Sequence, residues 1–308
     1  MTEILTITLN PALDASAEAD SVRPTHKVRT TEMRFDPGGG GINVTRVVAM
    51  MGGRTDAIFP AGAEIGNFLD RLLTEQDIRH RVIPVAGQTR INFVVVEPKT
   101  GLEYRFVAPG PTLQPSELQR CLDEVAAHEA GYVVASGSLP VAAPDDTYAR
   151  LAEITAARGA KFVLDSSGAG LKTALTMSKV HLVKPSLSEL EQLEGRKLDE
   201  EGIRQSAAGI VARGAAELVA VTLGANGALL ASANGILRVP AIQVPVHSAV
   251  GAGDSFLGAM VWALAEGKPA EEAFQWGMAA GAAAVMTRGA RLCQRSDVFE
   301  LFAKCHTS

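Results

Sequence analysis

The strongest chemical signal in the sequence is a pair of glycines that leads into an acidic residue, in Val250-Gly-Ala-Gly-Asp-Ser-Phe-Leu-Gly-Ala-Met260. A helical pattern follows at once, so the backbone N–H groups of Gly251, Ala252 and Gly253 can point into one concavity at a helix N-terminus. Such a concavity stabilises the negative charge that develops on a transferring phosphoryl group. Asp254 beside it can accept a proton from an attacking hydroxyl. On this stretch alone, a tight turn with Asp254 as an ordinary helix cap is an equally good interpretation.

A second glycine motif reads Pro37-Gly38-Gly39-Gly40-Gly41-Ile42-Asn43-Val44. Four glycines directly before a helical pattern allow a ligand to approach the backbone closely. Asn43, one turn into that pattern, can hydrogen-bond sugar hydroxyls. The motif lacks the Gly-Lys-Ser/Thr ending of a P-loop and does not match GxGxxG. Taken alone, it is better interpreted as a flexible turn.

Other patterns carry less chemistry. The run Val221-Thr-Leu-Gly-Ala-Asn-Gly227 leads a strand into a Gly-rich turn, which suits a nucleotide at a sheet edge. Because Ala228–Leu230 continues apolar, a plain strand–turn–strand hairpin is the better interpretation of that run alone. The six histidines are spread singly, without HxxH or HExxH spacing, and no GxSxG is present. Neither a histidine metal site nor serine hydrolase chemistry is indicated.

Strand-like apolar runs alternate with helical patterns along much of the chain. The expected strands are Ile4–Leu9, Ala57–Ala61, Tyr132–Ala135, Phe162–Asp165, His181–Lys184 and Leu218–Leu223, and the expected helices are Ile42–Met51, Ile65–Glu75, Leu118–Glu129, Asp145–Arg158 and Glu201–Arg213. Repeated strand–helix units predict a mainly parallel sheet with helices on both faces. Ligands of such sheets bind beyond the carboxyl ends of the strands, and the motifs above fall at those ends.

Residues 12–36 and 88–108 break this alternation of elements. Apolar and polar residues alternate there with few helix signals, as in Arg90-Ile-Asn-Phe-Val-Val-Val-Glu97. That pattern suits strands with one wet face, so it predicts a small separate β-sheet. The other face must be covered by substrate or by a second subunit, which makes the sheet a lid or an association surface. The Ala-rich stretch Gly277–Met286 favours a closely packed helix.

Composition narrows the class of protein. The 308 residues can form two domains of about 150 residues or one large α/β domain, and we interpret residues 1–308 as a single domain with its lid. The formal net charge is −5 without a Lys/Arg run, so nucleic acid is not an expected partner. Neither a signal peptide nor a membrane span is evident. Three scattered cysteines argue against a disulfide framework or zinc site and fit a reducing cytoplasm.

The two glycine motifs, at their separation in this chain, resemble the two signatures of the ribokinase/PfkB carbohydrate kinase family. The resemblance extends across essentially the whole chain, in Thr8–Asp14, Pro37–Val44, Ile58–Gly62, Tyr104–Val107, Ser136–Pro140, Asp165–Gly168, Leu182–Pro185 and Arg288–Cys293. Within that family the likeness is closest to the minor, ribokinase-type 6-phosphofructokinases. The resemblance implies an α/β fold, a ribokinase-like three-layer sandwich with a mainly parallel central sheet plus a small β-sheet lid.

The resemblance also implies roles for particular positions. Asp254 would be the catalytic base, and the turn of Gly251, Ala252 and Gly253 would be the anion hole. Contacts with the sugar are implied for Asp14, Gly39, Gly40, Asn43 and Ser138, with Asp14 as a hydroxyl acceptor. The candidates for the phosphate already on the sugar are Lys27, Arg90 and Arg105. A bidentate guanidinium matches a phosphate dianion, whereas an isolated basic residue is usually a solvated surface charge.

For ATP, the resemblance points to Lys184, Ser186, Thr222, Gly224 and Gly227. The family usually carries Asn-x-x-Glu for magnesium, whereas this chain reads Ser186-Leu-Ser-Glu189. Mg²⁺ retains waters and phosphate oxygens, so a serine acting through water can replace the amide beside Glu189. The resemblance further implies a potassium ion near Ser248, Val250, Ala284, Thr287, Gly289 and Arg291, largely through backbone carbonyls.

The expected activity is the MgATP-dependent phosphorylation of fructose 6-phosphate at its 1-hydroxyl, under a lid that excludes water. Kinases of tagatose 6-phosphate or fructose 1-phosphate are the nearest alternatives, although they more often carry lysine at the position of Gly40. A catalytically silent sugar-binding protein would have little need for Asp254. A nicotinamide oxidoreductase is rejected, because the first strand runs into Asn10-Pro-Ala12 and not into GxGxxG. The resemblance implies a homodimer built through the lid sheet.

Overall fold

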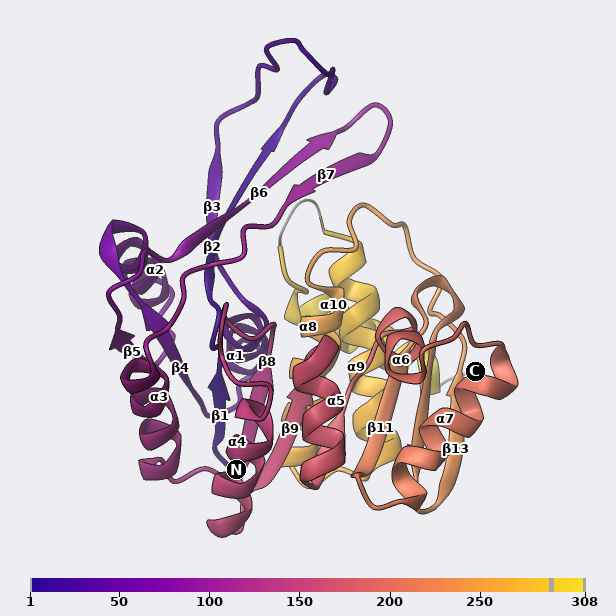
Figure 1. Ribbon diagram of the computed structural model, residues 1–308. Helices are drawn as coiled ribbons and strands as arrows, with labels where there is room; N and C mark the ends of the chain where they lie inside the picture. The colour runs from indigo at the N-terminus through magenta and orange to yellow at the C-terminus, as the bar shows by residue number, and fades with distance from the viewer. Residues whose placement is uncertain (1, 288–290, 307–308) are drawn as a thin grey trace.

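A nine-stranded sheet forms the centre of the computed structural model, which describes residues 2–287 and 291–306 (Figure 1). In spatial order its strands are β13 (Gly235–Val239), β12 (Ala228–Ser232), β11 (Ala216–Thr222), β10 (Val180–Val183), β9 (Lys161–Asp165), β8 (Tyr132–Ser136), β1 (Ile4–Ile7), β4 (Thr55–Ala61) and β5 (His80–Pro84). Neighbours from β11 to β5 are parallel, and β11, β12 and β13 form an antiparallel meander. The predicted mainly parallel sheet is confirmed.

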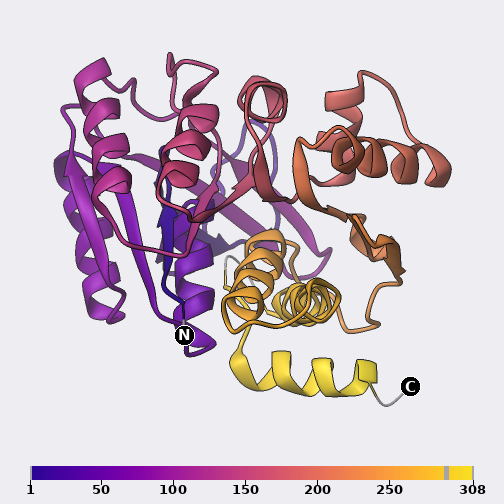
Figure 2. The ribbon, with the colours of Figure 1, turned by 90° about the horizontal axis from the view of Figure 1, so that it is seen from below.

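Helices cover both faces of this sheet, so the molecule has three layers (Figure 2). One layer contains α3 (Pro115–Ala127), α4 (Thr147–Ala157), α5 (Gly168–Met177), α6 (Leu187–Glu194) and α7 (Glu200–Ala212). The other contains α1 (Gly40–Met50), α2 (Ala63–Glu75), α8 (Ala252–Ala265), α9 (Ala270–Val285) and α10 (Arg295–His306), while the short 3₁₀ helix η1 (Gly224–Asn226) follows β11. Among the helices that the structure describes, none is both long and apolar enough to cross a membrane.

A second, four-stranded sheet stands above the carboxyl end of the first (Figure 1). Its order is β3 (Arg34–Gly38), β2 (Ala12–Glu18), β6 (Arg90–Glu97) and β7 (Leu102–Phe106), and we call it the lid sheet. The register aligns Asp14 with Asn92 on one face and Ala15 with Phe93 on the other. The sequence alternation thus separates a polar face from an apolar one, as predicted for a small separate sheet.

Each expected strand and helix overlaps an observed element, with ends that differ by a few residues. The Ala-rich stretch lies in α9, where a Cβ on Gly277 would come within 3.0 Å of the Phe256 carbonyl of α8. Close helix packing, and not flexibility, therefore explains these small residues. The edge strand β5 was not expected, because its mixed burial gives His80–Pro84 little periodicity.

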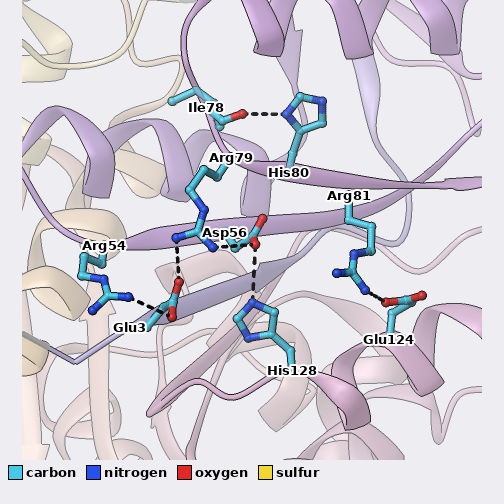
Figure 3. Close-up of polar contacts among 9 residues, drawn as sticks. All are labelled: Glu3, Arg54, Asp56, Ile78, Arg79, His80, Arg81, Glu124 and His128. Atoms are coloured by element: carbon cyan, nitrogen blue, oxygen red, sulfur yellow. Dashed lines mark hydrogen bonds and ion pairs between the residues drawn. The ribbon is translucent and has the colours of Figure 1, made fainter.

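A charged network joins strands at the opposite end of the sheet (Figure 3). Glu3 pairs with Arg79 at 3.0 Å and Arg54 at 3.7 Å, ahead of β1. Asp56 of β4 lies 3.3 Å from Arg79 and 3.5 Å from His128, which ends α3. These contacts fasten the amino ends of neighbouring strands to one another and to α3.

We expect Asp56→Ala to lower the free energy of unfolding by about 1 kcal/mol, with a fall of roughly 2 °C in Tm, because its carboxylate is largely buried and contacts both the Arg79 guanidinium and the His128 ring. Thermal denaturation followed by circular dichroism measures the change. Arg81→Ala is the control: it removes the more exposed pair with Glu124 and should change Tm by less than about 1 °C. Equal losses in both variants would contradict the role of burial.

Candidate active site

The two glycine motifs meet at the carboxyl end of the parallel sheet, where α1 and α8 begin. Asn43 lies in the first turn of α1 and Asp254 in the first turn of α8. The Asn43 Nδ2 atom donates a hydrogen bond of 2.8 Å to Asp254 Oδ2. The amide predicted to bind sugar and the carboxylate predicted to act as base are therefore in direct contact.

The Asp254 carboxylate is more basic than an ordinary aspartate. Burial raises its pKa from 3.8 to about 6, and the negative charge of Asp165 adds to the rise. The hydrogen bond from Asn43 and the positive charge of Lys184 act in the opposite direction, and Asp14 raises the pKa further. A carboxyl group with a pKa near 6 is ionised at neutral pH yet accepts protons readily, which suits a general base.

The turn before Asp254 presents unpaired backbone donors. Gly251 caps α8 with a φ of 75°, a left-handed conformation that glycine adopts without strain. In the part of the chain that the structure describes, the N–H groups of Gly251 and Gly253 have no acceptor, whereas the Ala252 N–H makes a long bond of 3.4 Å to Ala249. Asp254 makes no capping bond, so the helix-cap alternative is wrong. The turn can accept an anion at the positive end of α8.

A buried ion pair flanks this turn. Lys184 is 4% exposed, and its Nζ lies 3.0 Å from Asp165 Oδ1. Burial lowers the pKa of Lys184, but the charge and hydrogen bond of Asp165 outweigh burial and raise it. A Cβ on Gly253 would lie 3.4 Å from Lys184 Nζ, so the ammonium group faces the turn. Lys184 therefore supplies a fixed positive charge at the site.

The run of glycines at the start of α1 is tightly packed. A Cβ on Gly38 would lie 2.4 Å from the Asp14 carboxylate, and one on Gly40 would lie 2.2 Å from Ser136 Oγ. Gly39 has a φ of 111°, which side chains rarely adopt, and a Cβ there would meet Thr8 at 2.7 Å. The flexible-turn interpretation is therefore wrong: these glycines allow β1, β2 and β8 to approach the start of α1.

Asp14 faces the site from the lid sheet. Asn92 donates a hydrogen bond of 2.9 Å to its carboxylate, yet burial raises the pKa of Asp14 above its usual value. Arg105 on β7 pairs with Val94, two residues along β6 from Asn92, and so projects from the same face of the sheet. Its positive charge acts on Asp14 from there. An acidic acceptor and an exposed guanidinium thus share the polar face.

The other two predicted phosphate ligands, Arg90 and Lys27, have different surroundings. Arg90 pairs with Ala12 on the same face of the lid sheet as Asp14, and its positive charge lowers the pKa of Asp14. The Arg90 guanidinium donates to the carbonyls of Ala108 at 2.7 Å, Asn10 at 2.8 Å and Pro11 at 3.4 Å. It therefore ties together the hinge segments that join the lid sheet to the core. The loop between β2 and β3 forms the far tip of the lid sheet (Figure 1). Lys27 belongs to this loop, and its side chain is exposed.

Ser138 lies in the loop after β8. Its Oγ accepts a hydrogen bond of 3.2 Å from Asn10 Nδ2, which also donates to Pro109. The Asn10 Oδ1 atom is buried and has no partner in the described structure. An unpaired acceptor therefore adjoins the serine that was predicted to contact sugar.

The positions expected to bind ATP gather at one end of β10 and β11. Ser186 caps α6, and its Oγ donates to Glu189 Oε2 at 2.8 Å. A single bridge links Ser186 with Thr222, the last residue of β11. Gly224 borders open space, and Gly227 closes the turn with a φ of 90°. The strand–turn–strand hairpin is real, and its turn lies beside Ser186 at the predicted edge of the sheet.

Most positions expected around potassium also lie together. The Thr287 hydroxyl oxygen lies 2.8 Å from each of the carbonyl oxygens of Ala284 and Arg291, and its single proton can be donated to either. Ser248 is buried, donates its N–H to Val285 and accepts from Val250 through its hydroxyl. The loop before α8 and the end of α9 thereby bring backbone oxygens near one another. Gly289 lies outside the described residues.

Sequence reasoning missed three polar groups that support these side chains: Asp165, Asn92 and Arg46. Asp165 ends β9 and neutralises Lys184, whereas Asn92 anchors Asp14. Arg46 lies one turn after Asn43, and its NH1 atom donates to Asn43 Oδ1 at 3.2 Å. Asp165 follows an apolar strand, which is a signal for the carboxyl edge of a sheet. Asn92 and Arg46 have no such signal, because their partners are distant in sequence.

Comparisons with known proteins agree with this geometry. The model of the pfkB family carbohydrate kinases matches residues 5–297. The chain is 44% identical, over 98% of its length and 90% of the relative, to the ATP-dependent 6-phosphofructokinase isozyme 2 of Mycobacterium tuberculosis. It is 35% identical to a 1-phosphofructokinase of Xanthomonas campestris, over 85% of this chain and 84% of the relative.

Solved structures of phosphofructokinase-2 from Escherichia coli are also similar. The complex with potassium has a TM-score of 0.95 and 38% identity, covering 99% of this chain and 100% of that one. The complex with fructose-6-phosphate has a TM-score of 0.93 and 37% identity, covering 99% of both chains. The tetrameric inhibited form has a TM-score of 0.94 and 37% identity, covering 99% of this chain and 100% of that one. The chain belongs to the pfkB family of carbohydrate kinases, and the expected ribokinase-like fold is confirmed.

We expect Asp254→Asn to raise Tm by about 2–4 °C at pH 8. Because the folded-state pKa of Asp254 is about 6 and its ordinary value is 3.8, ionisation costs stability as pH rises from about 4 through 6. Asparagine removes this cost, so the gain should shrink as pH falls towards 4. Differential scanning calorimetry at pH 8 and pH 4.5 measures it. An unchanged or lower Tm at pH 8 would contradict the burial of an unfavourable charge.

Proposed function

We propose that this chain transfers the γ-phosphoryl group of ATP to the 1-hydroxyl of fructose 6-phosphate. The observation that carries the proposal is the 2.8 Å contact between Asn43 and Asp254, next to the N–H groups of Gly251 and Gly253, which have no acceptor among the described residues. The proposed base, the amide proposed to bind sugar and the turn proposed to bind an anion lie next to one another there. The names of the relatives, 6-phosphofructokinases among them, support fructose 6-phosphate as the acceptor.

In the proposed step, the 1-hydroxyl oxygen attacks the γ-phosphorus, and the bond from that phosphorus to the bridging oxygen of ADP breaks. Asp254 accepts the hydroxyl proton, since its pKa of about 6 leaves it ionised at neutral pH. The N–H groups of Gly251 and Gly253 and the Lys184 ammonium stabilise charge on the transferring group. The products are fructose 1,6-bisphosphate and ADP.

Groups on the lid sheet and on the core are proposed to hold the sugar phosphate together. Asp14 would accept hydroxyl hydrogen bonds, and Gly39, Gly40, Asn43 and Ser138 would line the same sugar. Arg105 is exposed on the polar face and is the better candidate for the 6-phosphate. Arg90 already donates to three carbonyls, so its role would be largely to hold the hinge. A role for Lys27 remains a prediction.

ATP is proposed to lie along Lys184, Ser186, Thr222, Gly224 and Gly227. Oxygen atoms of Ser186 and Glu189 are the donors that Mg²⁺ prefers, and Glu189 Oε1 is not used by the capping bonds. These two residues would hold the ion through water, and the ion would neutralise phosphate charge. The described residues contain no cluster of three or more His, Cys, Asp or Glu groups that could hold a metal, which suits coordination by phosphate and water.

A potassium ion is proposed near the loop before α8. The carbonyl groups of Ala284 and Arg291 converge on Thr287, and carbonyl oxygens are suitable ligands for an alkali cation. The potassium complex of the Escherichia coli relative supports this assignment. An ion there would lie against the loop that positions the anion turn, so it would support phosphate binding.

A second copy of the chain is the proposed partner of the lid sheet. Its apolar face exposes Phe35, Ile91, Leu102 and Phe106 by 37–60%. The aromatic rings of Phe35 and Phe68 pack at 5.4 Å, so α2 covers the part of this face next to the core. The remainder requires another cover. A cytoplasmic setting is supported by the buried free thiols of Cys121 and Cys293.

The first test is a coupled ADP-release assay with MgATP against fructose 6-phosphate, tagatose 6-phosphate, fructose 1-phosphate and free fructose. We expect strong preference for fructose 6-phosphate and a loss of at least about 100-fold in kcat for Asp254→Ala, because general base catalysis contributes that much. Preference for fructose 1-phosphate would instead favour the activity named for the Xanthomonas relative. Absence of turnover with every acceptor would favour a silent sugar-binding protein.

A substitution on the apolar face tests the proposed dimer. Phe106→Glu should raise the dimer dissociation constant at least about tenfold, because a charge would be buried in an apolar contact. Sedimentation velocity measures the change. Met177→Glu is the matched control, since Met177 is 61% exposed like Phe106 at 60% but lies at the end of α5. If Phe106→Glu sediments as the parent does, the two copies do not meet through this face.

A further inference from the structure

Arg46 lies behind Asn43, on the side away from Asp254. Its side chain is 13% exposed in α1, and its NH1 atom donates to Asn43 Oδ1 at 3.2 Å and to the Pro37 carbonyl at 3.1 Å. Its Nε atom donates to Gln76 at 3.1 Å. The guanidinium is therefore fixed from three directions, and one of its contacts is with the amide that touches the base.

The orientation of the Asn43 amide follows from its two neighbours. A guanidinium can only donate hydrogen bonds, and an ionised carboxylate can only accept them. Asn43 Oδ1 must therefore face Arg46, and Nδ2 must face Asp254. Without Arg46, the amide could rotate by half a turn and direct its oxygen at the carboxylate. The bond that stabilises ionised Asp254 would then be lost.

A carboxylate anchors Arg46 in this position. Asp36 is 3% exposed and lies 3.8 Å from Arg46 NH2. Arg34 makes a two-pronged contact with the same carboxylate, at 2.7 Å and 2.8 Å, but has no bond to Asn43. Burial lowers the pKa of Arg46, and the charge of Asp36 opposes that effect. Asp36 thus has two cationic partners, of which Arg46 alone continues to the active site.

We infer that Arg46 is a positioning residue: by accepting no hydrogen bond, it holds Asn43 so that its amide nitrogen always faces the carboxylate of Asp254. The inference rests on the proposed role of Asp254 as the base. The relay runs from Asp36 through Arg46 and Asn43 to Asp254. It keeps the base ionised. It also keeps the Asn43 oxygen from competing with Asp254 for the proton of the substrate hydroxyl.

Other charged groups also face Asp254. Asp165 on β9, Lys184 after β10 and Asp14 on β2 act on it directly through their charges, and Arg46 adds its own positive charge. Arg46 alone among these groups also contacts the amide. A substitution of Arg46 should therefore act on Asp254 both through the lost charge and through the Asn43 amide. The effect through the amide is isolated by comparing the substitution with and without Asn43.

The test compares the pH profiles of kcat/KM for the parent and Arg46→Met between pH 5 and 9. We expect the acidic limb to move upward by about half to one pH unit, because the ionised base loses a hydrogen bond. Relative to its value at pH 9, the kcat/KM of Arg46→Met at pH 6.5 should be about two- to threefold lower than that of the parent, because the pKa of the base moves from about 6 to between about 6.5 and 7. A loss by the same factor at every pH would overturn the inference, since a merely structural defect gives that result.

A double-mutant cycle separates the amide from long-range charge. In the Asn43→Ala background, Arg46→Met should move the acidic limb by no more than about 0.2 units, because the intermediary is absent. An equal shift in both backgrounds would mean that Arg46 acts on Asp254 by charge alone, which also overturns the inference. Arg46→Lys retains a head that only donates, and it should keep the limb within about 0.3 units of the parent.

Arg34→Met is the matched control, because it removes the other cationic partner of Asp36 and leaves Asn43 untouched. Its acidic limb should coincide with that of the parent. If Arg46→Met does not fold, Arg46→Gln serves instead, since a neutral amide can accept as well as donate. If Asp254→Asn retains turnover, Asp254 is not the base, and the proposed function fails separately. If Asp254→Asn is inactive but the acidic limb of Arg46→Met coincides with that of the parent, only the role of Arg46 is rejected.

Discussion

A carboxylate loses favourable hydration when it is buried, and it stays ionised only where neighbouring groups compensate that loss. Asp254 meets this requirement with a hydrogen bond from Asn43 and with the charge of Lys184. Lys184 is itself buried, and it remains charged because Asp165 lies 3.0 Å away. Each compensating group therefore needs another. The arrangement at the carboxyl end of the sheet follows from this chain of dependence.

Packing of α1 against α8 sets the distance between the Asn43 amide and the Asp254 carboxylate. Asn43 and Asp254 lie on α1 and α8, and Gly258 follows Asp254 by one turn of α8. A Cβ on Gly258 would lie 2.7 Å from the Cβ of Val47, which follows Asn43 by one turn of α1. The absent side chain lets the two helices approach, so the amide reaches the carboxylate at 2.8 Å. A residue without functional groups thus controls the geometry of the base.

The sequence predicts the parallel sheet, its helices and the position of the two glycine motifs at the carboxyl ends of strands, because local periodicity and sheet-edge rules determine these features. The resemblance assigns Arg90 to a phosphate, and that role stays a prediction. The sequence does not reveal that the same guanidinium also donates to three hinge carbonyls. A basic residue in an alternating strand does not reveal which acceptors the fold will bring to it. Asp36 and Arg46 escape prediction for the same reason, since their importance depends on what lies behind Asn43 after folding.

The short segments that join the lid sheet to the core limit which side chains a movement of the lid could displace. Asp14 belongs to the lid sheet, whereas Asp254 and Lys184 belong to the core, so the groups around a bound sugar are divided between two bodies. β2 follows β1 after four residues, 8–11, and Gly38 at the end of β3 precedes α1 by one residue. These connections are too short for the base of the lid sheet to move far, and Arg90 binds two of the hinge segments together. A closure of the lid sheet over substrate would therefore be a rotation that displaces its tip most. Asp14 and Arg105 both lie in the half of the lid sheet next to the core, because their partners on β6 are Asn92 and Val94. Sugar hydroxyls and the distal phosphate would thus both meet the part of the lid sheet that moves least.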